Sequence, residues 1–315
     1  MEEWSHERGT AVIEVQGLTK RYGDKVAVRN LSFSIKPGIV TGFLGPNGSG
    51  KSTTMRMIMG LDTPTSGTAT INGRPFTRAT RPQHEAAALL EAKAVHPGRT
   101  AYNHLAILAA ANGIPSSRIG EVLHLVGLSD TAKRRAGKFS LGMGQRLGIA
   151  AALLGDPRVL LFDEPVNGLD PEGIVWVRNL LRALAAEGRT VFVSSHLMEE
   201  MAKTADHLIV IGQGELKADT SVDAFIAQNS IQRVKVRSPQ LEVLEAALQA
   251  QGITTSRDGE TLFADKVTSE RVGELASAHG ATLHELHQEV ASLEDAFMEL
   301  TRESVEYVGQ TGAKP

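Results

Sequence analysis

A glycine-rich segment near residue 45 constrains the fold of this chain more than any other feature. It reads Gly45-Pro46-Asn47-Gly48-Ser49-Gly50-Lys51-Ser52-Thr53 and matches the pattern G-x-x-x-x-G-K-[ST]. An apolar run over residues 39–44 precedes it, and a helical pattern over residues 53–59 follows it. A glycine-rich turn without a ligand is the alternative, but such a turn requires neither the strand before it nor the helix after it. The segment predicts an α/β fold that binds a nucleoside triphosphate.

The polar groups of this segment have distinct expected tasks. The glycines let successive backbone N–H groups point at the α- and β-phosphates, and the positive end of the helix dipole adds to their effect. Lys51 would reach the β- and γ-phosphate oxygens, and the hydroxyl of Ser52 would bind Mg²⁺. The predicted nucleotide contacts in this segment are Asn47, Gly48, Gly50, Lys51, Ser52 and Thr53.

Composition and charge exclude several other classes of protein. The chain has 315 residues, of which 42% are hydrophobic and 22% charged, enough for a large globular domain with an appendage. Its formal net charge of −3, without a long basic run, argues against nucleic acid as the main partner. No run of about 18 uncharged apolar residues could span a membrane, and Glu2, Glu3 and Glu7 stand where a signal peptide would be basic. We expect a cytosolic protein, and because cysteine is absent we expect no disulfides or thiolate sites.

Periodicity predicts a β-rich beginning followed by a helical insert. Strands are expected at residues 11–15 and 31–35, around a turn at Gly23-Asp24, and a hairpin is expected at residues 68–71 with its turn at Asn72-Gly73. From residue 81 to residue 138 the pattern is mostly helical, in segments 86–90, 102–111 and 119–126.

Alternating elements return after this insert. Strands are predicted at residues 158–162, 190–194 and 208–211, with helices at residues 172–186 and 198–205 between them. Such alternation is typical of a parallel sheet whose strands are joined by crossover helices.

The pattern changes again after residues 212–215, and we place a domain boundary between residues 220 and 230. Beyond it we expect the β-α-β-β-α-β order of a ferredoxin-like unit. Its predicted elements are strand 232–236, helix 241–250, strands near residues 253 and 262, helix 269–279 and strand 282–288. A last helix is predicted at residues 292–301, and the tail from residue 309 to residue 315 is predicted to be disordered.

Two carboxylates at the end of an apolar strand indicate the chemistry. Asp163-Glu164 follow the apolar residues 159–162. Asp163 would hold the Mg²⁺ shell, and Glu164 would orient or deprotonate a water that attacks the γ-phosphate. Adjacent acids are common on plain protein surfaces, but together with the phosphate-binding pattern they favour a triphosphatase.

The sequence upstream of these carboxylates resembles a motif of a known family. It reads Phe139-Ser140-Leu141-Gly142-Met143, then Gln145-Arg146, and is similar to the LSGGQ signature of the ATP-binding cassette (ABC) ATPases. Further motifs follow in family order. Tyr22 matches the aromatic residue that stacks on adenine, Asn167-Gly168-Leu169-Asp170 matches the D-loop, and Ser194-Ser195-His196 matches the switch histidine. The resemblance covers residues 11–220.

The resemblance implies an α/β P-loop NTPase of ABC type in residues 11–220. Its parts are a RecA-like core, an antiparallel β subdomain and a helical subdomain at residues 81–150, and a small α+β ferredoxin-like domain follows at residues 221–308. The cofactors implied are ATP and Mg²⁺. A second ABC ATPase protomer, in a homodimer, is the implied partner, since Ser140, Gly142 and Asp170 would face the ATP held by that protomer. His196 would touch the γ-phosphate and sense its loss.

Departures from the family pattern point to one branch of it. Glu91 stands at the Q-loop position, where most members have glutamine, and it is expected to act in catalysis and to bind Mg²⁺. Leu141 and Met143 replace a glycine and the final glutamine of the signature, and the bulk of Leu141 is expected to perturb the backbone beside the phosphate. Both departures are familiar in bacterial exporter ATPases resembling those for daunorubicin and bacitracin resistance, whose C-terminal domain ends much like residues 292–301.

The function implied is ATP hydrolysis that drives a separate transmembrane permease, from the cytoplasmic face of the cell membrane, in drug or antibiotic efflux. Export of lipid or polysaccharide is an alternative. An importer ATPase with a regulatory C-terminal domain is another, although Glu91 and the terminal segment favour export. A soluble ABC ATPase that acts on ribosomes or DNA is a third, and the single cassette, the lack of sustained heptads and the lack of a basic face argue against it.

Overall fold

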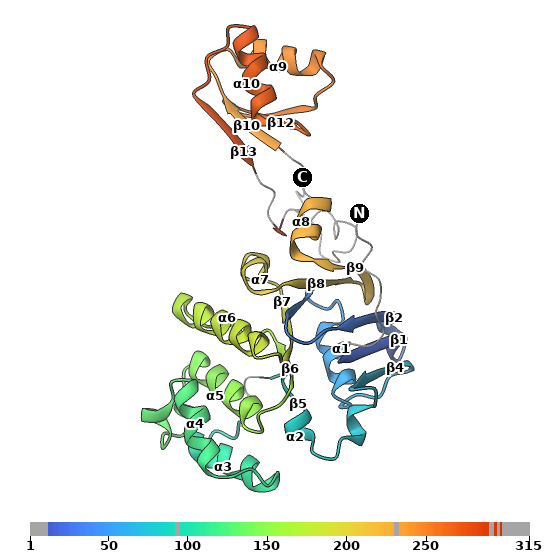
Figure 1. The fold of residues 1–315 in the computed structure, drawn as a ribbon, viewed down its shortest axis with the longest axis vertical. Helices are drawn as coiled ribbons and strands as arrows, with labels where there is room; N and C mark the ends of the chain where they lie inside the picture. Colours follow the sequence, from blue (N-terminus) through green and yellow to red (C-terminus); the bar gives the residue numbers. More distant parts are fainter. Residues whose placement is uncertain (1–11, 92–94, 230–232, 290–292, 295–296, 298–315) are drawn as a thin grey trace, which may run out of the picture. The chain divides into compact units, whose positions relative to one another are not determined.

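The chain folds into two compact units that divide between Val222 and Asp223. A computed structural model describes residues 12–91, 95–229, 233–289, 293–294 and 297 (Figure 1). The glycine-rich segment and both predicted carboxylates lie in the first unit. Helix α8 (Val222–Asn229) spans the point at which the units divide.

A six-stranded sheet forms the centre of the first unit, in the order β5-β6-β7-β3-β8-β9. Its strands are β3 (Val40–Leu44), β5 (Ala86–Leu89), β6 (Val159–Asp163), β7 (Thr190–Ser195), β8 (His207–Gly212) and β9 (Glu215–Ser221). Strands β5, β6, β7, β3 and β8 run parallel, and β9 pairs antiparallel with β8. Parallel strands are covered on both faces, which explains why every residue of β3 and β7, and every residue of β6 before Asp163, is buried. The carboxyl ends of the parallel strands therefore meet at one edge.

Helices cover this sheet and form a separate group beside it. The helices of the first unit are α1 (Lys51–Ile58), α2 (Pro82–Glu85), α3 (Ala101–Ala111), α4 (Ser117–Leu125), α5 (Leu141–Leu153), α6 (Pro171–Ala186) and α7 (Met198–Thr204). Helices α3, α4 and α5 pack on one another and form the green group in Figure 1. This group is the helical insert predicted between the strands.

A three-stranded antiparallel sheet in the order β2-β1-β4 completes the first unit. Its strands are β1 (Ile13–Tyr22), β2 (Lys25–Ile35) and β4 (Ser66–Ile71). Phe33 of β2 packs against Phe43 of β3 and Phe192 of β7, with ring centroids 5.8 and 5.9 Å apart. The two sheets therefore share one apolar core, which also receives the buried face of α1.

The second unit is a four-stranded antiparallel sheet covered by two helices. Its elements are β10 (Arg233–Arg237), α9 (Leu241–Ala250), β11 (Thr255–Asp258), β12 (Thr261–Asp265), α10 (Ser269–Ala278) and β13 (Glu285–Glu289). The sheet order is β11-β12-β10-β13. Val234, Val236, Leu244 and Leu262 lie in its core. Most of the helix predicted at residues 292–301, and the tail from residue 309, lie outside the described residues.

One local prediction was wrong and another was confirmed only in part. Residues 86–90 were predicted to be helical, but Ala86–Leu89 form strand β5 at the edge of the large sheet, because so short an apolar run fits a buried strand as well as a helix. The hairpin predicted at residues 68–71 forms only its turn at Asn72-Gly73, where Ile71 and Arg74 each donate a backbone N–H to the other's carbonyl oxygen. Strand β4 pairs with β1, and Ile71 reaches the following segment only through a bridge to Arg74. After Arg74 the chain continues into a short 3₁₀ helix at Phe76–Arg78 instead of a second strand.

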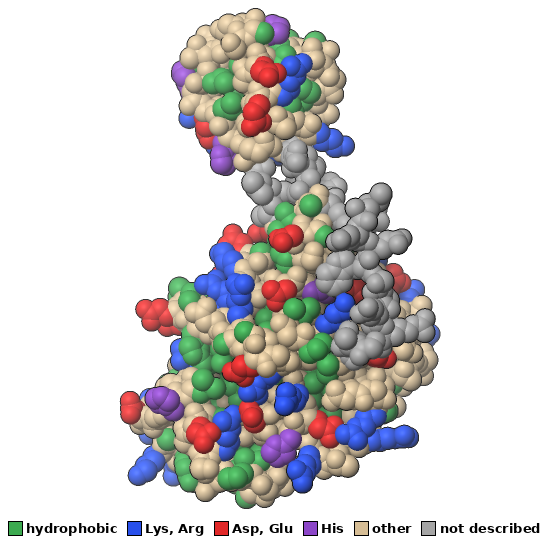
Figure 2. Space-filling view, in the orientation of Figure 1, with side chains coloured by type: hydrophobic (Ala, Val, Ile, Leu, Met, Phe, Trp, Pro, Cys, Tyr) green, Lys and Arg blue, Asp and Glu red, His purple; other side chains and the backbone are tan. Residues whose placement is uncertain are grey.

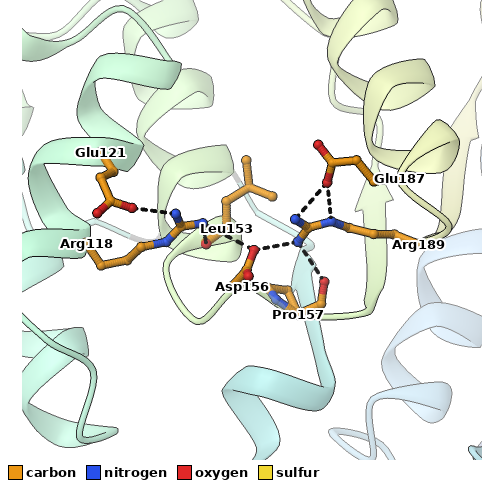
Figure 3. Close-up of polar contacts among 7 residues, drawn as sticks. All are labelled: Arg118, Glu121, Leu153, Asp156, Pro157, Glu187 and Arg189. Atoms are coloured by element: carbon orange, nitrogen blue, oxygen red, sulfur yellow. Dashed lines mark hydrogen bonds and ion pairs between the residues drawn. The ribbon is translucent and has the colours of Figure 1, made fainter.

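An ionic cluster joins the helical group to the large sheet (Figure 3). Asp156 lies between α5 and β6, and its Oδ1 is 3.3 Å from Nη2 of Arg118 in α4 and 2.8 Å from Nη1 of Arg189, which precedes β7. Arg189 also pairs with Glu187 at 2.8 Å. Burial alone would lower the pKa of the Arg189 guanidinium, but its hydrogen bonds to Asp156 and Glu187 outweigh burial and raise it. The cluster thus holds the connection where the chain returns from the insert to the sheet.

Replacing Asp156 by Asn is expected to lower the free energy of unfolding by about 0.5–1 kcal/mol, because exposed ion pairs contribute little each. Asn keeps the left-handed backbone of Asp156, whose φ is 54°, so that only the charge changes. Urea unfolding at low salt and at about 1 M salt should show the difference shrinking as the charges are screened. Asp24→Asn, at an exposed acid in the turn between β1 and β2, is the matched control. A deficit that is independent of salt would contradict an ionic role for the cluster.

The surface mixes both signs of charge. On the face drawn in Figure 2, Lys and Arg side chains are interspersed with Asp and Glu. Within the described part of the chain, no helix is both long enough and apolar enough to cross a membrane.

Candidate functional site

Three loops at the carboxyl edge of the large sheet bring the predicted site residues together. The glycine-rich segment follows β3, Glu164 follows Asp163 at the end of β6, and His196 follows Ser195 at the end of β7. Because β7 lies between β6 and β3, the three loops are neighbours. The carboxyl edge of a parallel sheet is the usual place for ligand binding in such folds.

The glycine-rich segment turns tightly against the strands beside it. Gly50 has a φ of 104°, and a Cβ atom on it would lie 2.5 Å from the carbonyl oxygen of Ala27 in β2. The backbone N–H of Gly214, in the turn between β8 and β9, donates to the carbonyl oxygen of Ser49 at 3.1 Å. Only glycine fits at position 50, and helix α1 starts directly after it, at Lys51.

Lys51 is the buried cation of the site. Its side chain is only 6% exposed, and its Nζ donates to the carbonyl oxygens of Gly45 at 2.6 Å and Pro46 at 3.2 Å. Burial lowers the pKa of Lys51, and the nearby carboxylates of Glu164 and Asp163 oppose this effect. Ser52, beside it at the start of α1, is exposed, and Thr53 is half-buried.

Glu164 and its neighbours form a connected polar group. One carboxylate oxygen of Glu164 is 4.0 Å from Nζ of Lys51, and the other is 2.8 Å from Nδ1 of His196. The Ser194 hydroxyl donates to the Asp163 carboxylate and accepts from the backbone N–H of Glu164 at 3.0 Å. Glu164 has a φ of 50°, which is uncommon for a residue other than glycine. The arrangement joins an acid, a histidine and a cation beside the phosphate-binding pattern.

Glu91 stands apart from this group. It follows β5, whose Leu89 is paired in parallel register with Phe162, so that Glu91 lies beyond the same edge as Asp163. It is exposed, and among the described residues it makes no hydrogen bond or ion pair. Its carboxylate contributes to raising the pKa of Arg56, after the larger effect of Asp62. The structure therefore does not bring Glu91 into contact with Asp163 or Ser52.

The residues of the predicted signature begin helix α5. Ser140 caps this helix by accepting a hydrogen bond from the Met143 N–H at 3.2 Å. The Leu141 side chain lies over Gly168, where a Cβ atom would come 2.0 Å from its Cδ2. The Leu141 side chain thus packs on the loop after β6, and its expected effect on the backbone beside the phosphate stays a prediction. Asp170 caps α6 through the N–H of Gly173 at 2.9 Å.

Tyr22 ends β1 and is half exposed, and its hydroxyl donates to Asp62 at 3.1 Å. Sequence reasoning missed Asp62, and it also missed the bridging role of Ser194 and the contact of Gln145 Nε2 with the Glu164 carbonyl oxygen at 3.4 Å. Ser194 and Gln145 are both buried. A polar residue at the buried end of an apolar strand was the signal that could have identified Ser194.

The donor groups at this edge fit a magnesium nucleotide. Hydroxyl and carboxylate oxygens, such as those of Ser52 and Asp163, are ligands that Mg²⁺ accepts. No group of three or more His, Asp or Glu side chains that could hold a metal occurs in the described parts of the chain. Mg²⁺ does not require one, because it is usually bound through one or two carboxylates together with substrate phosphates and water.

Comparison with known proteins supports a nucleotide-binding role for this site. The ABC transporter family matches residues 28–167, and a domain family of unknown function matches residues 232–294. The bacitracin transport ATP-binding protein BcrA of Bacillus licheniformis is 42% identical over 223 residues, which are 70% of this chain and 73% of that protein. The uncharacterized ABC transporter ATP-binding protein YhcH of Bacillus subtilis is 36% identical over 303 residues, 94% of this chain and 98% of that protein.

A solved structure shows the same fold. The dimeric ATP-binding cassette MJ0796, in a post-hydrolysis state bound to ADP and Pi, is 26% identical, with a TM-score of 0.61. The match covers 67% of this chain and 98% of that chain. The first unit thus has the P-loop NTPase fold of ABC ATPases, with mixed α/β sheets. On these similarities, and on the glycine-rich segment at the start of α1, the chain belongs to the family of ABC transporter ATP-binding proteins.

Proposed function

We propose that this chain is the ATP-hydrolysing subunit of a bacterial exporter. The observation that carries the proposal is the chain of contacts from Lys51 through Glu164 to His196, beside the glycine-rich segment. In this proposal the cation, the carboxylate and the histidine lie at the γ-phosphate end of a bound triphosphate. ATP binding, closure of a dimer and hydrolysis would then drive a separate permease.

The site residues have separate proposed roles. The backbone of Asn47, Gly48 and Gly50 binds phosphate oxygens, together with Lys51 and Thr53. Glu164 takes the proton of the attacking water, and His196, in contact with Glu164, keeps that carboxylate in place and contacts the γ-phosphate. Ser52 and Asp163 would hold Mg²⁺ together with the phosphates, Glu91 would join them only after a movement toward the site, and the metal would supply charge neutralisation at the phosphates. Tyr22 stacks on the adenine ring.

A second protomer completes the proposed site. In the view of Figure 1, α1 and α5 lie on opposite sides of β6, which supports a second chain as the source of the signature residues Ser140 and Gly142. A partner chain would present these residues, with Asp170, to the ATP. The dimeric state of the similar MJ0796 cassette supports this arrangement.

Export of a drug or antibiotic is the proposed transport reaction, at the cytoplasmic face of the cell membrane. The bacitracin transport protein BcrA supports this class over the importer and non-transport alternatives. We assign nucleotide binding to residues 11–220, with the helical subdomain at residues 81–150. We assign an accessory role to a ferredoxin-like domain at residues 221–308. The β-α-β-β-α-β order and the sheet order β11-β12-β10-β13 support the ferredoxin-like fold of this domain.

Purification of the tagged chain from gently solubilised native membranes tests the proposed function. A polytopic membrane protein is expected to co-purify and to remain bound after a wash at about 0.5 M salt, which screens weak surface attraction. An untagged strain processed in parallel is the control. Recovery of the chain alone or with ribosomes would contradict the transport role.

A further inference from the structure

The Tyr22 ring is held at its hydroxyl end. Tyr22 is the last residue of β1 and pairs with Lys25 across the turn, which leaves the side chain 50% exposed. Its hydroxyl donates to Oδ2 of Asp62 at 3.1 Å. Burial and the hydrogen bond to Asp62 raise the pKa of the Tyr22 phenol, so that the hydroxyl stays a donor at neutral pH. A half-exposed ring that is fixed at one end keeps its orientation.

Asp62 is itself fixed by the helix that begins at the phosphate-binding segment. Arg56 of α1 donates to both carboxylate oxygens of Asp62, from Nε at 2.9 Å and from Nη2 at 3.2 Å. The carbonyl oxygen of Arg56 also accepts from the backbone N–H of Leu61 at 2.9 Å. The hydrogen bond from Arg56 lowers the pKa of the Asp62 carboxyl, with burial opposing it, so that Asp62 is a carboxylate at neutral pH. A two-point contact of this kind fixes direction as well as distance.

Lys20 approaches the ring of Tyr22 itself. Its Nζ is 5.0 Å from the centroid of the Tyr22 ring and donates to the carbonyl oxygen of Thr63 at 2.6 Å, one residue after Asp62. A cation at this distance is attracted to the face of an aromatic ring. Lys20 thus lies over one face of the half-exposed ring, and a planar ligand would stack on the opposite face.

We propose that Asp62, held by Arg56, is a positioning residue that sets the Tyr22 ring for stacking with the base of a bound nucleotide, on the face away from Lys20. The inference rests on the proposed function, in which Tyr22 contacts adenine. Lys51 and Arg56 both belong to α1. The phosphate end and the base end of the site are therefore aligned by one helix, and a ligand that has phosphates but no base does not use Asp62.

Comparing the affinities of the full chain for ATP and for inorganic tripolyphosphate separates the contribution of the base end from that of the phosphate end. Affinities are measured by calorimetry without Mg²⁺, so that ATP is not consumed. Tyr22→Ala is expected to weaken ATP about 10-fold, the effect of losing one stacked base. Asp62→Ala and Tyr22→Phe are each expected to weaken it about 5-fold, which corresponds to one hydrogen bond of about 1 kcal/mol. Tripolyphosphate affinity should stay unchanged in all three variants.

Two further variants isolate positioning from a general structural effect. Asp62→Asn keeps one acceptor for the Tyr22 hydroxyl but loses one of the two contacts with Arg56, so its ATP affinity should lie between those of the wild type and Asp62→Ala. In the Tyr22→Ala background, Asp62→Ala should have no further effect, because the ring it orients is absent. Asp24→Ala removes an exposed acid two residues from Tyr22 and is the control.

Each contrary result would overturn a different part of the proposal. Equal losses of ATP and tripolyphosphate affinity in Asp62→Ala would show that Asp62 supports α1 as a whole, and would overturn the positioning role. Unchanged ATP affinity in Asp62→Ala, with a loss in Tyr22→Ala, would overturn it while the adenine contact stands. Unchanged affinity in Tyr22→Ala would overturn the adenine contact and the positioning role together. No binding of either ligand to the wild-type chain would overturn the proposed function itself.

Discussion

Replacing Glu164 by Gln is expected to lower the rate of ATP hydrolysis by about 10²–10⁴-fold, the usual contribution of a general base. Gln keeps the size of the side chain and can still contact His196, but it cannot accept a proton from water. ATP binding should persist, because Lys51 and the glycine-rich segment are unchanged. Phosphate release, followed at saturating ATP with Mg²⁺, measures the rate, and size-exclusion chromatography should show dimers accumulating with ATP.

A nearby variant separates the roles of the two contacting side chains. His196→Ala removes the 2.8 Å contact with Glu164 but leaves the carboxylate, so its loss of rate should be smaller than that of Glu164→Gln. Glu187→Gln, at the opposite end of the sheet before β7, is a matched control and should hydrolyse ATP normally. Normal turnover in Glu164→Gln would show that another group takes the proton.

Replacing Lys51 by Ala is expected to weaken ATP binding by about 10- to 100-fold, because hydrogen bonds from a charged group contribute about 1.5–3 kcal/mol. Lys51 is a buried cation at the start of α1, and Ala leaves the loop without its ammonium group. Equilibrium binding of a fluorescent ATP analogue measures the affinity. Lys133→Ala, at an exposed position before the signature, should bind as the wild type does. Equal affinities for the Lys51→Ala and wild-type proteins would contradict the phosphate contact.

Removing Lys51 also has an expected effect on stability at alkaline pH. Burial lowers the pKa of Lys51 in the folded protein, so between that pKa and the ordinary value of 10.5 the unfolded chain binds more protons than the folded one. Stability of the wild type therefore gains from this residue as pH rises through that window. Lys51→Ala should lack this gain, and urea unfolding of both proteins from about pH 8 to pH 10 measures the difference.

The parts of the site that were predictable are those encoded in consecutive residues. The segment Gly45 to Thr53 and the pair Asp163-Glu164 each join a strand end to a fixed set of donors or acids, so their spacing alone carries the chemistry. The parallel sheet and the chain order of the second unit also follow from periodicity. Periodicity does not predict which strands pair with each other. Strand β4, for example, pairs with β1 across an intervening segment of 43 residues that includes β2 and β3.

Tertiary contacts account for most of what the sequence did not reveal. Residues 86–89 are a strand because β6 offers a partner on the edge of the sheet. Ser194 and Asp62 have no motif of their own, and each is defined by a side chain that comes from a distant part of the chain. The contact of Leu141 with Gly168 likewise depends on how α5 meets the loop after β6. Such partners are set by packing and not by local pattern.

The left-handed backbone at Glu164 lowers the stability of the fold, whereas the carboxylate at the same position is needed for ATP hydrolysis. A φ of 50° costs a residue of this type about 1–3 kcal/mol, whereas glycine and asparagine enter that region readily. A variant library sorted by melting temperature alone would therefore enrich side chains at position 164 that lack the carboxylate facing His196. Laboratory evolution of a more robust enzyme has to select for hydrolysis in every round, or the surviving chains will bind ATP without consuming it.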